Sequence, residues 1–294
     1  MGYFHGYKGY RFARSAANRL PATDFAQIGT VYDFDMQLKV IFYPQIMKVE
    51  TALKNYTLEA VLEDSSSERF EDIWKRSLTG YRDARPGRQY RDAWQNRYRL
   101  RGTVDRLITL NNNSRDVIRH FRDADKDIPI WALFEVMSLG DFGQFYKCLS
   151  RKVKLKIAEE LGMPTNWDST HLLQCMIFTL KDLRNAVAHN GAVFDARFKT
   201  GGIDANIGRL LQQEMGAAKL DIKFDSITDY LLLIVYLMVA IKLPKSETRR
   251  FVRAFEDAIE QFRANVPLEI YSLVFGTETR GKIRLAKHFV ASGK

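Results

Sequence analysis

The sequence predicts an all-α protein. Apolar residues recur at helical spacing through most of the chain, most clearly from Leu172 to Leu183. Only residues 219–224 alternate between apolar and polar side chains as a strand does, and that run is short. With 294 residues, of which 46% are hydrophobic, the chain can bury one large core or two modest ones.

Breakers and capping residues divide the first two thirds of the chain into separate helices. We expect helices over residues 25–42, 44–62, 114–121, 129–140, 143–161 and 170–189. Asp24 is placed to cap the first and Ser114 the third, while Gly140 and Gly162 are placed to end the fourth and fifth.

The last third of the chain follows a linker candidate, Gly201-Gly202. Three more helices are expected over residues 203–218, 226–243 and 246–264. The longest uncharged apolar run, residues 230–241, is too short to span a bilayer and reads as a fully buried helix. A basic group near the C-terminus is compatible with a solvated tail: Arg280, Lys282, Arg284, Lys287 and Lys294.

The segment Asp182–Gly191 carries the clearest candidate for chemistry. Its helix should run through His189, which puts Asn185 and His189 on one face at i and i+4, with Asp182 one turn below. Arg184 is displaced from His189 by roughly 140° around the axis, so only its long side chain could reach the imidazole. Arg184 and His189 would project into one groove most easily if a second helix, or a second copy of this one, closed over them.

These residue types suit RNA cleavage without a metal, because RNA supplies its own nucleophile in the 2′-hydroxyl. His189 can transfer protons near neutral pH, Arg184 can stabilise charge on the phosphate, and Asn185 can orient the imidazole or bind the phosphate. The alternative is a buried structural histidine that caps a helix end, with Arg184 in a surface ion pair.

Four blocks then resemble one family in the family's own order. They are Gly9–Phe12, the pair Tyr32–Leu38 and Lys48–Lys54 (Y-x-F-D-x-x-L … K-x-E-x-A-L), the run Pro129–Gly140 (P-x-W-A-x-x-E-x-x-S-x-G) continued by Phe145–Leu149, and the R-x4-H segment itself. Together they resemble the Abi (AbiD/AbiF-like) abortive-infection family of the HEPN superfamily. The chain departs from that pattern at Asn190-Gly191, where many members have a second polar or basic residue.

The resemblance implies a HEPN-type helical bundle over residues 1–200, with additional C-terminal helices over residues 201–294. Within the first domain we expect a basic RNA-binding insertion at about residues 68–106. It also implies a toxin of phage defence that cleaves RNA by 2′-hydroxyl transesterification to a 2′,3′-cyclic phosphate, with Arg184, Asn185 and His189 as catalytic residues. A homodimer with a composite site and a structured antitoxin RNA as regulator are further implications. Two glutamates within the blocks, Glu50 and Glu135, are candidates to orient the site residues or to form structural ion pairs.

Charge is concentrated in residues 75–106, which we call the basic segment. It holds ten basic and three acidic residues, a net of +7 in a chain whose formal net charge is +10. Arginine suits phosphate contacts and stacking, and interleaved aromatic residues suit single-stranded or looped RNA. The expected RNA-binding residues are Arg82, Arg85, Arg88, Arg91, Arg97, Arg99, Arg101, Tyr90 and Trp94. A solvated helix face with its aromatic residues turned inward is the alternative.

Other classes of function find less support. Cys148 and Cys175 lack a zinc or disulfide spacing, and the remaining histidines, His5, His120, His171 and His288, lack metal-ligand spacing, so we expect neither metal nor cofactor. The N-terminus lacks a signal-peptide core, and a cytoplasmic protein without membrane association is expected. A catalytically weak HEPN module that binds RNA or scaffolds a complex, and a helical protein-interaction domain, remain the alternative functions.

Overall fold

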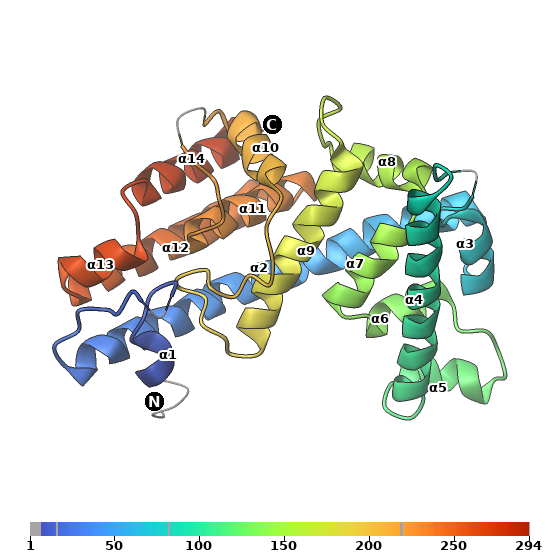
Figure 1. The fold of residues 1–294 in the computed structure, drawn as a ribbon, viewed down its shortest axis with the longest axis horizontal. Coiled ribbons are helices and arrows are strands. Elements are labelled where there is room, and N and C mark those ends of the chain that lie inside the picture. The colour runs from blue at the N-terminus through green and yellow to red at the C-terminus, as the bar shows by residue number, and fades with distance from the viewer. Residues whose placement is uncertain (1–6, 16, 82, 218–219, 294) are drawn as a thin grey trace. The chain divides into compact units, whose positions relative to one another are not determined.

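The computed structural model describes residues 7–15, 17–81, 83–217 and 220–293, and this part of the chain is all-α, as predicted (Figure 1). The helices, in chain order, are α1 (Lys8–Tyr10), α2 (Phe25–Ser65), α3 (Phe70–Arg76), α4 (Arg88–Asn111), α5 (Asp116–Asp123), α6 (Ile130–Val136), α7 (Leu139–Cys148), α8 (Arg151–Glu160), α9 (Ser169–Ala188), α10 (Ala205–Met215), α11 (Ile227–Ala240), α12 (Lys245–Asn265), α13 (Leu268–Val274) and α14 (Thr279–Ser292). Extended pairing in the described residues is limited to isolated antiparallel bridges at Phe12–Arg19, Arg69–Pro129 and Leu78–Leu149.

The chain divides into two compact units. The first comprises residues 1–49 and 179–294, and the second comprises residues 50–178. The chain leaves the first unit within α2 and returns to it within α9. The domain boundary expected from the sequence, at residue 200, does not coincide with these units. It stays a proposal about domain architecture.

The core of the first unit is built around α11. Every residue of this helix from Ile227 to Met238 is buried, which confirms the expectation of a buried helix here apart from its last turn. Helices α10, α12 and α14 pack on it, and Figure 1 shows them gathered around it in orange and red. The first half of α2 adds aromatic contacts, because Phe34 stacks on Phe262 of α12 at 4.3 Å between ring centroids.

One member of the C-terminal basic group belongs to this core, three lie on the surface of α14, and Lys294 lies outside the described residues. Lys282 of α14 is buried and donates to the Asp229 carboxylate of α11 at 2.7 Å. Arg280 pairs with Glu260 of α12 at 3.0 Å. Lys282 therefore serves in packing, whereas the Arg280 ion pair is exposed and contributes little to stability.

The strand-like alternation at residues 219–224 does not produce a strand in its described part, residues 220–224. Residues 220–224 form irregular chain packed on α10, where Gly208 allows the Ile222 carbonyl to approach so closely that a Cβ would stand 2.1 Å from its oxygen. Backbone contact with a helix therefore replaces pairing with another strand.

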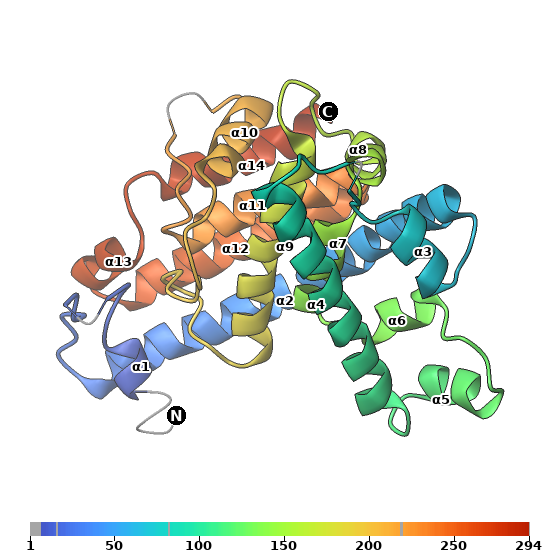
Figure 2. The same cartoon turned by 45° about the vertical axis from the view of Figure 1, so that its right-hand side comes forward.

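The second unit places α4 across α7 and α6, with α5 beside α6 (Figure 2). A single helix over residues 143–161 was predicted, but α7 ends at Cys148 and α8 begins at Arg151. The break is stabilised by pairing with another segment, since the Ser150 N–H donates to the Ser77 carbonyl at 2.8 Å. Ser150 then caps α8 by accepting a hydrogen bond from the Val153 N–H.

Two other predicted helix ends were also wrong. Helix α5 begins at Asp116, and Ser114 donates back to the Leu110 carbonyl of α4 at 3.5 Å instead of capping α5. Gly140 lies in the first turn of α7, which starts at a capping box formed by Ser138 and Asp141. Pro129 does stand at the start of α6, as predicted.

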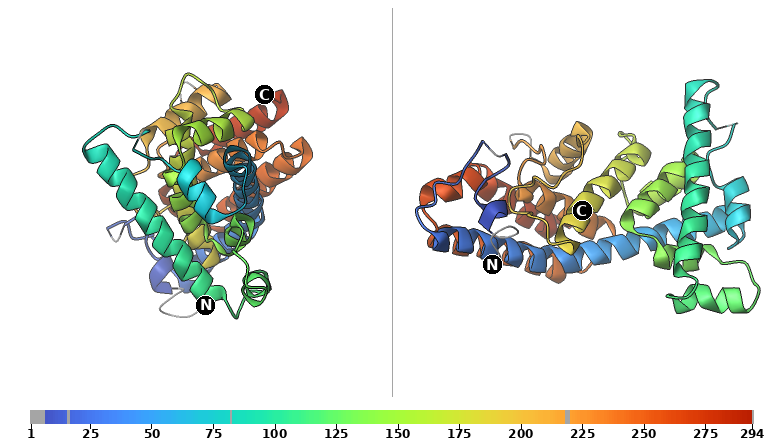
Figure 3. Two further views of the ribbon diagram at one scale, coloured as in Figure 1. Left: turned by 90° about the vertical axis from the view of Figure 1, so that its right-hand side faces the viewer. Right: turned by 60° about the horizontal axis from the view of Figure 1, so that its bottom comes forward.

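Two helices were predicted on either side of Pro44, but α2 runs unbroken through it, as the right panel of Figure 3 shows. Proline removes one backbone hydrogen bond and crowds the carbonyl four residues earlier, that of Val40. Pro44 is exposed and Val40 is 72% exposed, so water can hydrate that carbonyl. Asp24 caps the helix as predicted, accepting from the Gln27 N–H at 2.9 Å. In the described part of the chain, every helix falls short of the combined length and apolarity that a membrane span needs.

Candidate functional site

The Arg184–His189 segment lies at the C-terminal end of α9. The helix ends at Ala188, one residue before the predicted end, so that His189 becomes its C-terminal cap. The backbone N–H of His189 still donates to the Asn185 carbonyl at 2.9 Å. Asn185 and His189 are therefore one turn apart, as predicted, and both are exposed. The alternative interpretation was a buried structural histidine that caps a helix end. His189 does lie at the helix end, but it is exposed rather than buried.

Asn190 fixes how the helix ends. Its φ of 57° is left-handed, a conformation that asparagine tolerates better than most residues. The Gly191 N–H donates to the Ala186 carbonyl at 2.7 Å, and the Asn190 N–H reaches the Val187 carbonyl at 3.4 Å. These two bonds make a Schellman motif. His189 thus occupies a defined helix end, and the chain turns away directly after it.

Arg184 lies on a different side of the same helix end. It is half-buried and precedes His189 by five positions, which corresponds to roughly 140° around the axis. One copy of the chain therefore presents an imidazole and a carboxamide on an exposed face, with the guanidinium on the partly covered side. This arrangement can move a proton and hold a phosphate oxygen at the same place.

Asp182, predicted on the same stripe, fastens the chain that follows the helix. Its carboxylate accepts from the Thr200 N–H at 3.1 Å and from the Thr200 hydroxyl at 2.9 Å, and it pairs with Lys181 at 2.7 Å. These contacts give Asp182 a positioning role in the turn between α9 and α10.

A buried carboxylate of α2 holds the segment just beyond His189, and the sequence did not reveal this role. Asp35 is 0% exposed. Its Oδ1 atom accepts the backbone N–H groups of Val193 at 2.7 Å and Phe194 at 2.8 Å. Two N–H groups that would otherwise be buried without partners are thereby satisfied.

Tyr10 and Lys39 complete the surroundings of Asp35. The Tyr10 hydroxyl donates to Asp35 Oδ2 at 2.6 Å, and the Lys39 ammonium pairs with the same oxygen at 2.7 Å. Burial, and then the charge of Asp35, raise the pKa of Tyr10, so its hydroxyl stays a donor. Lys39 also donates to the Asn190 side chain at 2.7 Å, which links α2 to the residue after His189.

A second carboxylate, Asp195, joins the N-terminal segment to the same stretch of chain. It accepts the Arg14 N–H at 2.6 Å and the Arg197 side chain at 2.9 Å. Arg197 also donates to the Phe12 carbonyl at 2.8 Å. Residues 10–14 and 193–197 are thus fastened together at several points next to the end of α9.

The two glutamates considered as partners of the site have other surroundings. Glu50 forms an ion pair with Lys54 at 3.0 Å, and Lys54 donates to the Met137 carbonyl at 2.7 Å. Glu135 is exposed on α6. For Glu50, these contacts support the structural interpretation.

The basic segment contains two kinds of arginine. The first kind has exposed side chains and comprises Arg85, Arg88, Arg91 and Arg99. The ion pair that Arg88 forms with Asp92 is weak, because 3.9 Å separate the charged atoms and both side chains are exposed. Arg82, also expected to bind RNA, lies outside the described residues.

The second kind is half-buried and contacts residues of α3. Arg97 donates to the Trp74 carbonyl at 2.7 Å and stacks over the Trp74 ring at 4.8 Å. Arg101 pairs with Glu71 at 2.6 Å and also lies over Trp74, at 5.5 Å from the ring centroid. The sequence could not separate these two arginines from the exposed ones, since their acceptors are on or beside α3.

Aromatic residues of α4 are available beside the exposed arginines. Trp94 is 50% exposed and Tyr98 is 52% exposed, and their rings lie 4.4 Å apart. Tyr90 is half-buried and packs edge-on against Tyr81 at 4.9 Å. The alternative in which the aromatic residues turn inward therefore holds in part for Tyr90 but not for Trp94.

In a comparison with protein families, residues 1–195 of the 294 match the Abi-like protein family. No curated protein and no solved structure matches the chain. The matched region includes Tyr10 and Asp35, the end of α9 with His189, and the segment that Asp35 fastens. Since this region makes up most of the sequence, the chain belongs to the Abi-like protein family.

Proposed function

We propose that this protein is a metal-independent endoribonuclease of the HEPN type that acts as a toxin in phage defence. Membership of the Abi-like family suggests the role in abortive infection. The observation that carries the reaction is His189, an exposed histidine held at a capped helix end one turn from Asn185. Accessible histidines are the commonest proton-transfer groups in enzymes at neutral pH.

In the proposed reaction, the 2′-hydroxyl of a ribose attacks the adjacent phosphorus, and the bond to the next 5′-oxygen breaks. A base removes the 2′-hydroxyl proton and an acid protonates the leaving oxygen, giving a 2′,3′-cyclic phosphate and a 5′-hydroxyl. His189 serves as one of these proton-transfer groups. Arg184 stabilises the charge that develops on the phosphate, and Asn185 orients the imidazole or binds a phosphate oxygen.

A second copy of the chain supplies the other half of the site on this proposal. The reaction uses both an acid and a base, and a two-fold interface would bring two His189 side chains to one cleft. The outer face of α2 supports such an interface, because Val40 is 72% exposed and Tyr43 is 43% exposed. Both lie close in sequence to Lys39, which contacts the residue after His189.

The exposed part of the basic segment is the proposed RNA surface. Arg85, Arg88, Arg91 and Arg99 can contact phosphates, while Trp94 offers a ring for base stacking. A structured antitoxin RNA that restrains the toxin is the proposed occupant. Arg97 and Arg101 contribute indirectly, by holding α4 on α3.

The test is RNA cleavage by purified His189→Ala and Arg184→Ala variants. We expect each to lose on the order of 10²-fold or more in rate, because each removes a proton-transfer group or a charge-stabilising donor. His288→Ala is the matched control, since His288 is exposed on α14 within the same unit. Thermal melting should show that the variants are folded, and cleavage should persist in EDTA. Undiminished cleavage by both site variants would exclude the proposed chemistry.

A further inference from the structure

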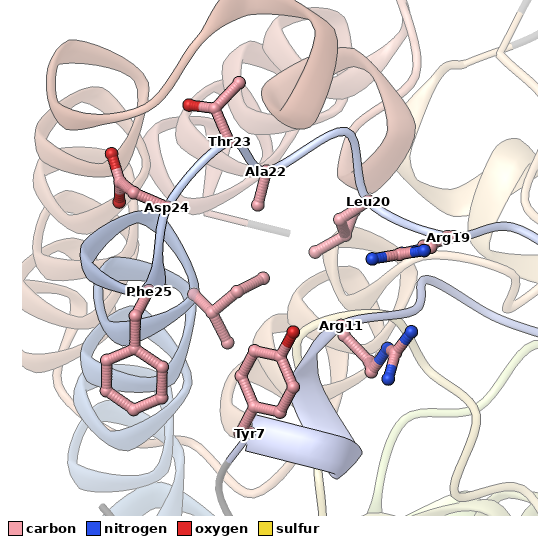
Figure 4. Close-up of a pocket in the computed structure, with 9 residues that line it drawn as sticks. Tyr7, Arg11, Arg19, Leu20, Ala22, Thr23, Asp24 and Phe25 are labelled. Atoms are coloured by element: carbon pink, nitrogen blue, oxygen red, sulfur yellow. The ribbon is translucent and has the colours of Figure 1, made fainter.

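The N-terminal end of α2 borders a pocket of about 380 Å³ whose lining includes neither the residues at the end of α9 nor those of the basic segment. Its walls include Tyr7, Arg11, Arg19, Leu20 and Phe25 (Figure 4). We propose that this pocket binds a nucleotide, holding its phosphate with the two arginines and its base against the apolar wall. This inference goes beyond the proposed ribonuclease activity.

Two guanidinium groups are brought to one side of the pocket by local backbone pairing. The Leu20 N–H donates to the Arg11 carbonyl at 2.9 Å, and Arg19 pairs with Phe12 in an antiparallel bridge. In Figure 4 the Arg19 side chain extends toward the space between Leu20 and Tyr7, and Arg11 lies just below it. The two cations therefore converge on a volume that a phosphate could fill.

Neither charge is neutralised within the described part of the chain. The structure shows no ion pair for Arg11 or Arg19 there, and the Nε atom of Arg11 is buried without an acceptor. Asp24 also lines the pocket, but its carboxylate caps α2 through the Gln27 N–H at 2.9 Å. A buried guanidinium nitrogen without a partner costs free energy, and a phosphate oxygen would satisfy it.

A second wall is apolar and aromatic, and it adjoins the arginines, because Arg11 Cζ lies 5.6 Å from the centroid of the Tyr7 ring. The Tyr7 and Phe25 rings are nearly parallel, with 24° between their planes and 5.6 Å between their centroids. Phe25 is 56% exposed although it is large and apolar, while Leu20 is buried at 3%. A flat base can cover the exposed ring. Inorganic phosphate alone would leave this wall unused, so the combination of walls favours a nucleotide.

Calorimetric titration of the full chain tests the proposal, in a His189→Ala background so that RNA probes are not cut. We expect AMP to bind at least about 10-fold more tightly than either adenosine or inorganic phosphate, because only AMP engages both walls. Arg19→Gln should weaken AMP binding by about 10-fold or more, and Phe25→Ala should weaken it as well. Both residues are exposed, so these substitutions leave the fold intact.

Arg250→Gln is the matched control, because Arg250 is an exposed arginine of α12 in the same unit and the change in net charge is identical. Two oligoribonucleotides of one sequence, with and without a 5′-phosphate, then identify the source of the nucleotide. If only the phosphorylated oligoribonucleotide competes with AMP, the ligand of the pocket is the 5′ end of an RNA. If neither competes, the ligand is a free nucleotide. Absence of AMP binding at millimolar concentration, or equal binding by Arg19→Gln and Arg250→Gln, would overturn the proposal.

Discussion

Replacing Asp35 with asparagine is expected to destabilise the first unit strongly. The substitution leaves the Lys39 ammonium buried without its countercharge. Whichever way the new amide is turned, its NH2 group faces donors, either the Val193 and Phe194 N–H groups or the Tyr10 hydroxyl and Lys39. Removing one partner of a buried ion pair typically costs about 3–5 kcal/mol. Urea denaturation should therefore show a loss of this order in the free energy of unfolding.

Asp33→Asn provides the comparison for that experiment. Asp33 is an exposed residue of the same helix, and the change in charge and shape is the same. Its effect should stay within about 0.5 kcal/mol. Equal losses for the two variants would show that Asp35 does not hold the chain after α9.

The Cys148 thiol gives a second prediction at this scale. Burial raises the pKa of Cys148 to about 11. Alkylation requires the thiolate, so at pH 8 only about one thiol in a thousand is reactive in the native state. Iodoacetamide should modify Cys148 much more slowly in the folded protein than in urea, and the rate in the folded protein should rise as the pH approaches 11. Mass spectrometry of the labelled peptide would measure this, and equal rates in both states would contradict it.

At the scale of the elements, substitutions in and just before α4 test the proposed RNA surface. Changing Arg85, Arg88 and Arg91 together to glutamine should weaken binding of structured RNA and flatten its salt dependence. Removing the charge that faces one phosphate lowers the slope of log K against log salt by up to about 0.9, because one fewer counterion is released on binding. Filter binding over a range of salt concentrations measures this slope.

Three exposed arginines of α12, Arg249, Arg250 and Arg253, form a control set with the same change in net charge. Their replacement should leave both affinity and slope close to those of the parent protein. If the two triple variants lose affinity equally, binding responds to total charge and α4 is not the RNA surface.

The positions of the helices were predictable from sequence to a large extent, whereas several of their ends were not. Apolar spacing locates α2, α9 and α11 because the buried stripe repeats along each of them. The break between α7 and α8 depends on pairing of Ser150 with Ser77, a contact between residues far apart in sequence. Continuity of α2 through Pro44 depends on which side of that helix faces solvent. Local patterns contain neither piece of information.

The candidate site likewise has features that were predictable from the sequence and features that were not. The spacing of Asn185 and His189 follows from helical periodicity and was predictable. The contacts of Asp35 with Val193 and Phe194 join two segments that only the tertiary structure brings together. Tyr10 and Asp35 both lie in blocks on which the family resemblance rests, and that coincidence was the available signal that they act as one group.

At the scale of the whole molecule, the dimer proposal predicts a mass twice that of the chain by light scattering. A glutamate substituted for Val40 and another for Tyr43 should convert the protein to a monomer and reduce cleavage, because charges would then enter the proposed interface. Leu268→Glu is the control, since Leu268 is 64% exposed on α13 in the same unit. A monomer that still cleaves RNA at nanomolar enzyme would exclude a composite site.

The contacts of Asp35 also bear on how the protein is made. Its backbone partners lie 158 and 159 residues further along the chain. At roughly 5–20 residues per second, the ribosome adds them about 8–30 seconds after Asp35. Until then the carboxylate lacks these partners, because the chain beyond His189 has not been made. On the proposed activity, a nascent toxin therefore cannot complete its cutting site before the ribosome has added Val193 and Phe194.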